Sequence, residues 1–132
     1  MAVPRPRILV VDDEPGLRDM LAILFRREGL DVTLAAGLAK ARDAVETATE
    51  PFGVVLTDLL MPDGSGMDLL GFVKQRAPQT EVILMTAHGG IETAIEAMRG
   101  GAYDFVTKPF ATTELRALVQ KALEKRAIVT EN

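Results

Sequence analysis

Five short apolar runs alternate with stretches of helical periodicity, and this alternation limits the chain to very few folds. The runs cover residues 7–11, 31–35, 54–58, 81–86 and 103–107. The third, from Val54 to Asp58, has four apolar or β-branched residues in a row and stops at a carboxylate. Continuous runs of this length are typical of strands buried on both faces, as in parallel sheets that helices cover. We therefore predict five strands of one buried sheet.

Apolar residues recur at helical spacing after each of the five runs, which predicts five helices. Ser65, with Asp68 three residues later, resembles a capping box at the start of the third helix. Connections of only a few residues between alternating strands and helices indicate an α/β fold with a doubly wound parallel sheet. The expected helices run from Pro15 to a stop at Gly29, over residues 38–48, from Ser65 to Pro78, over residues 91–98, and from a cap at Thr112 or Thr113 to Leu123.

Length and charge limit the classes of function that are open to this chain. The 132 residues are enough for one ordinary domain with a single core. The net charge of −4 and the pI near 5.0 argue against nucleic-acid binding by this segment, because phosphate contacts need clustered Lys and Arg. The absence of Cys excludes disulfides and thiolate sites, and the start of the chain has neither a signal peptide nor a membrane-spanning stretch. We expect a soluble cytoplasmic domain with no membrane contact.

Polar residues follow four of the predicted strands at the point where each ends. They are Asp12 and Asp13 after the first strand, Asp58 after the third, Thr86 after the fourth and Lys108 after the fifth. Ligands of open α/β sheets bind outside the carboxyl ends of the strands, so these side chains are expected to converge on one edge. Each residue alone has an ordinary structural explanation, such as a turn cap for Asp58 or an exposed cation for Lys108. Their joint placement predicts a functional site.

Three carboxylates in one pocket require a compensating charge. Each pair repels by roughly 4 kcal/mol at 4 Å and an effective dielectric of about 20. Mg²⁺ is the expected solution, because the site offers only oxygen ligands. Mg²⁺ beside a phosphoryl group makes Asp58 a candidate nucleophile that forms an aspartyl phosphate, with Lys108 and Thr86 contacting the phosphoryl oxygens.

These motifs together resemble the receiver domain of two-component response regulators. The resemblance covers about residues 7–123 and implies a flavodoxin-like sheet of strand order 2-1-3-4-5 with five helices. It places the receiver (response regulatory) domain at residues 1–125, and residues 126–132 as a C-terminal tail that starts a linker to a missing effector domain. The motifs are Asp12-Asp13, Asp58 followed by Met61-Pro62 and Gly66, Thr86-Ala87, and Lys108-Pro109-Phe110.

The resemblance implies a phosphoacceptor signalling switch rather than a conventional enzyme. Asp58 would accept a phosphoryl group from a sensor histidine kinase and lose it by slow autodephosphorylation. Asp13, Asp58 and the backbone carbonyl of Leu60 would bind Mg²⁺, and Asp12 would contribute through water.

The resemblance also assigns residues around the phosphoryl group. Lys108 would contact the phosphate and form a cis peptide bond with Pro109. Thr86 would be the switch hydroxyl, and Phe105, three positions before Lys108, the switch aromatic.

Two further positions, Leu60 and His88, would tune the lifetime of the phosphoryl group. The stretches 61–67 and 86–105 look most like the nitrogen-regulation branch of the family, which contains enhancer-binding, sigma-54-dependent activators. The expected output is therefore transcription regulation.

The resemblance implies two contact surfaces. The face made by the fourth helix, fifth strand and fifth helix, around Ile95, Met98 and Leu115, would form a homodimer or dock to an effector domain. The first helix, near Leu17 and Met20, would dock to the kinase.

Two other functions stay open on the residues alone. An aspartyl-phosphate phosphohydrolase also uses an Asp at a strand end, but such enzymes usually have a second acid two residues later, where this chain has Leu60. A binding module that is never phosphorylated would need a Gly-, Ser- or Thr-rich phosphate loop after the first strand, where this chain has Asp12-Asp13-Glu14.

Overall fold

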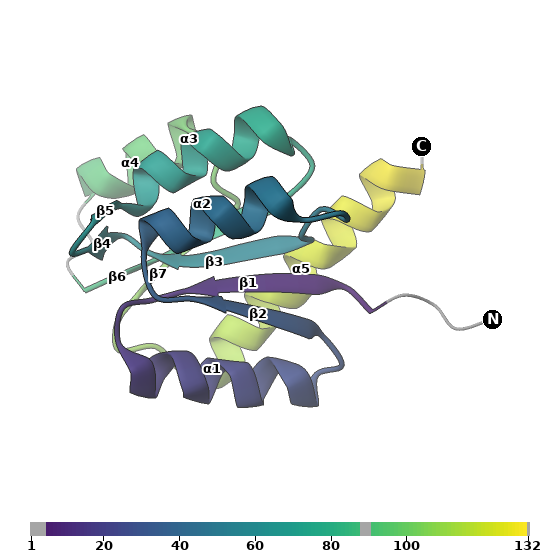
Figure 1. Cartoon of the computed structure of the whole chain (residues 1–132), viewed down its shortest axis with the longest axis horizontal. Coiled ribbons are helices and arrows are strands. Elements are labelled where there is room, and N and C mark those ends of the chain that lie inside the picture. The colour runs from purple at the N-terminus through teal and green to yellow at the C-terminus, as the bar shows by residue number, and fades with distance from the viewer. Residues whose placement is uncertain (1–4, 88–90, 132) are drawn as a thin grey trace.

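The computed structural model describes residues 5–87 and 91–131, and it contains the predicted five-stranded parallel sheet (Figure 1). The strand order is β2-β1-β3-β6-β7, and all four neighbouring pairs are parallel. With β6 and β7 as the fourth and fifth predicted strands, this is the expected order 2-1-3-4-5. The strands are β1 (Arg7–Val11), β2 (Asp31–Ala35), β3 (Val54–Asp58), β6 (Glu81–Thr86) and β7 (Asp104–Thr107).

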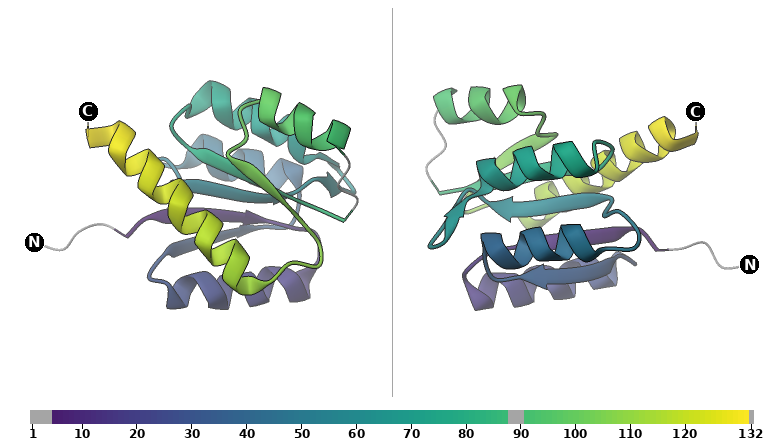
Figure 2. Two further views of the ribbon diagram at one scale, coloured as in Figure 1. Left: turned by 180° about the vertical axis from the view of Figure 1, so that it is seen from behind. Right: turned by 45° about the horizontal axis from the view of Figure 1, so that its top comes forward.

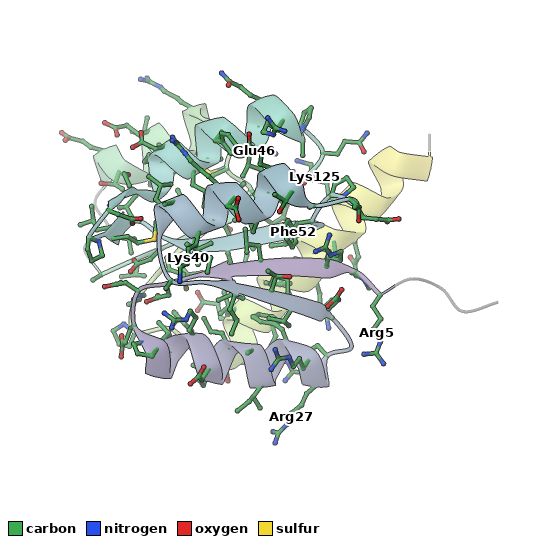
Figure 3. The ribbon with its side chains drawn as sticks, in the orientation of Figure 1. Arg5, Arg27, Lys40, Glu46, Phe52 and Lys125 are labelled. Atoms are coloured by element: carbon green, nitrogen blue, oxygen red, sulfur yellow. The ribbon has the colours of Figure 1, made fainter. Side chains whose placement is uncertain are left out.

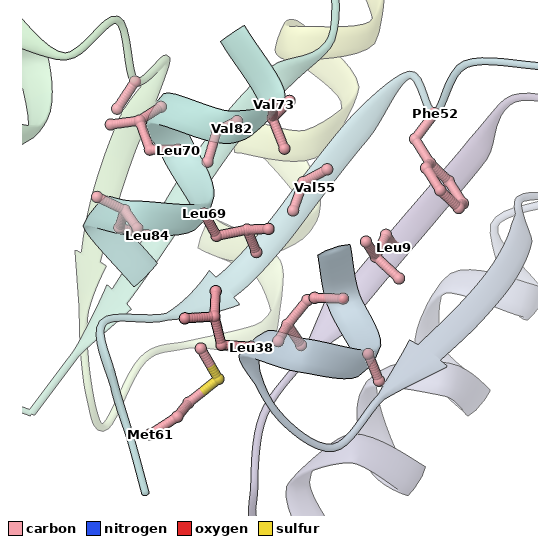
Figure 4. Packing of buried hydrophobic residues seen from close by; sticks show 14 of the residues in the cluster. Leu9, Leu38, Phe52, Val55, Met61, Leu69, Leu70, Val73, Val82 and Leu84 are labelled. Carbon is pink, nitrogen blue, oxygen red and sulfur yellow. The ribbon is translucent and has the colours of Figure 1, made fainter. Parts of the chain in front are cut away.

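Helices cover both faces of this sheet, as the apolar runs predict. Strand residues alternate between the faces, so that Leu9 and Val55 belong to one buried cluster while Ile8 and Leu56 belong to the other. The first cluster packs against α2, α3 and α4 (Figure 4), and the second against α1 and α5, which lies diagonally across its face (Figure 2). The helices are α1 (Pro15–Arg27), α2 (Leu38–Thr47), α3 (Gly66–Arg76), α4 (Ile91–Arg99) and α5 (Thr112–Glu131).

The helix ends agree with the predictions at α3 and differ at α5. Ser65 is the N-cap of α3, and its Oγ accepts a hydrogen bond from the Met67 N–H at 3.0 Å. Thr112 is already the first residue of α5, so neither Thr112 nor Thr113 is the cap. The helix also continues to Glu131, through residues expected to form a tail. Good helix formers such as Glu, Lys, Arg and Ala maintain a helix where the apolar pattern fades.

A small hairpin after β3 is absent from the sequence-based prediction. Its strands are β4 (Leu60–Met61) and β5 (Gly64–Ser65), which pair antiparallel. Two residues per strand are too few to produce a periodic pattern. The hairpin occupies the connection between Asp58 and α3.

Candidate functional site

Three carboxylates meet at the carboxyl edge of the sheet, as predicted from the strand ends. Asp12 and Asp13 follow β1, and Asp58 is the last residue of β3. One carboxylate oxygen of each lies within 4.8 Å of those of the other two, which is close enough for a shared cation. In the part of the chain that the structure describes, no second group of three acidic, His or Cys side chains meets this condition.

The three acids differ in burial and in their protein partners. Asp12 is fully buried, and its oxygens accept hydrogen bonds from the Glu14 N–H at 2.9 Å and from Lys108 Nζ at 2.9 Å. Asp13 is exposed, and the Asp58 side chain is 13% exposed. Protein donors therefore already engage both oxygens of Asp12, whereas Asp13 and Asp58 have room for direct ligands.

Lys108 connects two of these acids. Its Nζ lies 2.9 Å from Asp12 Oδ2 and 3.3 Å from Asp58 Oδ2, and its side chain is 21% exposed. The Lys108–Pro109 peptide bond is cis, as predicted. The same ammonium group is thus in contact with the candidate nucleophile and with a fully buried carboxylate.

The pKa values of Asp58 and Lys108 are both shifted by burial and by the charges around them. Burial raises the pKa of Asp58 and so do the charges of Asp12 and Asp13, and together they outweigh the lowering effect of Lys108. Burial lowers the pKa of Lys108, but the hydrogen bond and charge of Asp12 and the charge of Asp58 raise it overall. An ion pair normally lowers the pKa of its acid, and the pKa of Asp58 is raised instead because burial is the largest influence on it and the neighbouring acids add to it.

The structure places the predicted switch and tuning residues as follows. Thr86 is buried at the end of β6, and its carbonyl accepts a hydrogen bond from the Lys108 N–H at 2.7 Å. Phe105 is half-buried on β7 and packs against the cluster on the α2–α3 face. Leu60 begins β4 and is 66% exposed. His88 lies outside the described residues.

One contact in the site was not predicted from the sequence. The Arg18 guanidinium, from the first turns of α1, donates to the backbone carbonyl of Asp12 at 2.7 Å. A basic residue soon after a pair of acids is a common helix pattern and gives no signal of this contact. Arg18 therefore fixes the loop that presents Asp12 and Asp13.

A separate cleft of about 820 Å³ lies at the opposite edge of the sheet, where β1 and β2 begin. Its lining includes Arg5, Asp31 and Glu50, and Arg5 extends outward from this edge (Figure 3). None of the predicted site residues lines it. The candidate site and this cleft are therefore distinct.

Comparison with known proteins identifies the family. The model of the response regulator receiver domain matches residues 8–120, which is most of the chain. The chain belongs to the response regulator receiver family. It is 47% identical over 122 residues to the response regulator protein PilR of Pseudomonas aeruginosa, covering 92% of this chain and 27% of PilR. The regulatory protein AtoC of Escherichia coli is 40% identical over 126 residues, covering 95% of this chain and 27% of AtoC.

Solved receiver domains have the same fold. The receiver of a putative LuxO repressor from Vibrio parahaemolyticus has a TM-score of 0.89 at 30% identity and covers 96% of both chains. The beryllofluoride-activated NtrC4 receiver dimer has a TM-score of 0.84 at 34% identity and covers 91% of this chain and 98% of that one. A putative NtrX-like response regulator of Rickettsia bellii is 37% identical, and the match covers 95% of this chain and 26% of that protein. Together with the NtrC4 receiver, this relative confirms the expected nitrogen-regulation branch.

Receiver domains of response regulators are signalling domains. This chain spans about a quarter of the length of the curated relatives given above, for example 27% of PilR. In the part of the receiver that the structure describes, no helix is both long and apolar enough to cross a membrane.

Proposed function

We propose that this receiver accepts a phosphoryl group on Asp58 from a sensor histidine kinase in the cytoplasm and thereby controls a transcriptional output. The observation that carries the proposal is the meeting of Asp12, Asp13 and Asp58 within 4.8 Å, with Lys108 Nζ 3.3 Å from Asp58. A carboxylate nucleophile, a fixed cation and an acidic metal site are the parts that phosphoryl transfer to an Asp requires.

The residues fit a resident Mg²⁺ because they are hard oxygen donors, two of which have room for direct ligation. Asp13, Asp58 and the Leu60 carbonyl would hold the ion, and Asp12 would contribute through water. Bound there, Mg²⁺ would neutralise charge on the transferring phosphoryl group.

In the transfer step, a carboxylate oxygen of Asp58 attacks phosphorus, and the bond from phosphorus to the donor's imidazole nitrogen breaks. The imidazole leaves with the electron pair and takes up a proton. Lys108 offsets the negative charge on the phosphoryl oxygens, which helps most if it is in place before the reaction. Leu60, which is exposed and apolar, would influence how readily water attacks the product, and His88 would be the second tuning position.

The phosphorylated state would be sensed by Thr86 and Phe105. Phosphorylation adds nearly two negative charges and strong acceptor oxygens, which would draw the Thr86 hydroxyl toward the site. Phe105 packs in the neighbouring cluster, so its position can follow this movement. A coupling of about 1–3 kcal/mol is typical of such switches.

The output surface would be the face formed by α4, β7 and α5. Ile95 and Met98 on α4 are 45% and 50% exposed, which suits a homodimer contact or an effector domain. Met20 on α1, which is 38% exposed, together with Leu17 would contact the kinase. Residues 126–132, of which 126–131 continue α5, would lead from the domain at 1–125 into a linker.

Incubation of the chain with a small acyl phosphate and Mg²⁺, followed by intact-mass measurement, tests the proposal. We expect slow, Mg²⁺-dependent addition of one phosphoryl group per chain. Rapid turnover of the donor without accumulation would support a phosphohydrolase, and no modification would support an inert binding module. Either result would overturn the proposed function.

A further inference from the structure

The β4–β5 hairpin begins two residues after Asp58, and its own pairing is minimal. Leu60 pairs with Ser65 and Met61 with Gly64, which leaves Pro62 and Asp63 as the turn. An isolated two-stranded hairpin is at best marginally stable in water. Contacts with the rest of the molecule must therefore hold it in place.

Asp63 makes the polar contact that attaches this hairpin to α2. Its Oδ1 accepts a hydrogen bond from the Leu38 N–H at 2.8 Å, and its Oδ2 accepts one from the Ala39 N–H at 3.0 Å. These are the first two N–H groups of α2, which have no partner within the helix. Gly37, the N-cap residue, has no side chain with which to cap them. Asp63 thus caps a helix that lies 24–25 residues earlier in the chain.

The residues around Asp63 leave space for its contact with the start of α2. A Cβ on Gly37 would lie 2.8 Å from Asp63 Oδ1, so that any side chain there would displace the carboxylate. Gly64 has a φ of +153°, and a Cβ on it would collide with the Leu38 side chain. Met61 is 8% exposed and shares a buried cluster with Leu38 (Figure 4). Three hairpin residues, Met61, Asp63 and Gly64, therefore lie against the start of α2.

We propose that Asp63 is a positioning residue for the phosphoacceptor site. By capping α2 it holds the β4–β5 hairpin, and with it the segment from Asp58 to Leu60, in the arrangement that binds the cation. This inference rests on the proposed function, because it concerns how the chain presents the Mg²⁺ ligands of that site. Groups that orient metal ligands typically change metal affinity by 10–100-fold when they are lost.

The test compares Asp63→Ala with Ala44→Gly, a matched control in the middle of α2. Both variants weaken α2, by loss of a cap or by a glycine in the helix, and each is expected to lower Tm by about 3–5 °C. Only Asp63→Ala also releases the hairpin. The readouts are the Kd for Mg²⁺ in the absence of any phosphoryl donor, and amide hydrogen exchange of residues 60–65 in metal-free buffer.

We expect Asp63→Ala to weaken Mg²⁺ binding by about 10-fold or more and to speed exchange in the hairpin. Ala44→Gly should leave the Kd within 2-fold of the wild-type value. Equal Kd values for Asp63→Ala and the wild type would overturn the positioning role while leaving the proposed function intact. Absence of Mg²⁺ binding by the wild type would instead overturn both.

Gly37→Ala provides a second variant in case Asp63→Ala does not fold. Gly37 has an extended φ of −175°, which alanine adopts without strain, so the substitution displaces the Asp63 carboxylate without straining the backbone. Alanine is also a poorer N-cap than glycine, and Ala44→Gly controls for this weakening of α2. The same weakening of Mg²⁺ binding is expected. A Gly37→Ala variant with wild-type affinity and wild-type hairpin exchange would contradict the proposal.

Discussion

Asp58→Asn is expected to abolish phosphoryl uptake from a small acyl phosphate and to raise the stability of the domain in Mg²⁺-free buffer. Asparagine keeps the shape of the side chain and an oxygen that accepts from Lys108, but it has no carboxylate to attack phosphorus. The gain in stability arises because the charged form of Asp58 is disfavoured by burial and by Asp12 and Asp13. After allowance for solvent screening, we expect a gain of about 1 kcal/mol or less.

The pH dependence of folding stability tests whether Asp58→Asn is stabilising. The pKa of Asp58 in the folded chain is raised above its ordinary value of 3.8. The stability that Asp58 contributes through its raised pKa is therefore fully present below the ordinary value of 3.8, where the carboxyl group is protonated. This contribution is lost as pH rises through the higher pKa of the folded chain. The advantage of Asp58→Asn should be greatest at neutral pH and should disappear in acid.

Intact-mass measurement and chemical denaturation check the two parts of this prediction. Asp68→Asn is the matched control, because it removes an exposed carboxylate from the first turn of α3, outside the acidic cluster. It should take up phosphoryl like the wild type. Phosphorylation of Asp58→Asn at the wild-type rate would show that another residue is the acceptor.

Lys108→Ala is expected to slow phosphoryl uptake by about 100–1,000-fold while Mg²⁺ binding is kept or becomes tighter. The loss of rate follows from removal of a fixed cation beside the nucleophile, an effect similar in size to loss of an oxyanion-hole donor. The effect on metal binding has the opposite sign, because without the ammonium the three acids attract a cation more strongly. Lys108→Ala also leaves buried Asp12 Oδ2 without its donor, which should cost about 1–3 kcal/mol of folding stability.

Lys40→Ala is the control for Lys108→Ala, because it removes an exposed lysine from α2 (Figure 3). The two variants are compared by initial rates of mass addition at saturating Mg²⁺ and by separate Mg²⁺ titrations. Parallel loss of uptake and of Mg²⁺ binding in Lys108→Ala would indicate general damage to the site. A wild-type rate would remove Lys108 from the mechanism.

The fold could be predicted because its main determinants are local. The run from Val54 to Asp58 is typical of a strand buried on both faces, and Pro15 and Gly29 bound the first helix. Convergence of Asp12, Asp58 and Lys108 then follows, since parallel strands end at one edge. No contact between distant residues had to be known in advance.

The remaining features depend on contacts between distant segments. The sequence does not show that Asp12 is the buried acid, because its burial results from packing and from the bond to Lys108, 96 residues away. The bonds from Asp63 to the start of α2 likewise leave no local pattern. Continuation of α5 past residue 125 depends on helix propensity in a stretch without a periodic apolar face.

Paramagnetic broadening by Mn²⁺ tests most directly whether the three acids form a cation site beside Asp58. Mn²⁺ prefers the same oxygen ligands as Mg²⁺, and it broadens the NMR signals of nearby amides. We predict saturable broadening at Asp12, Asp13 and Asp58, which excess Mg²⁺ reverses and Asp13→Asn weakens. Amides at the opposite edge of the sheet, such as those of Asp31 and Glu50, should stay sharp. Broadening centred on that opposite edge, or none at the three acids, would contradict the account.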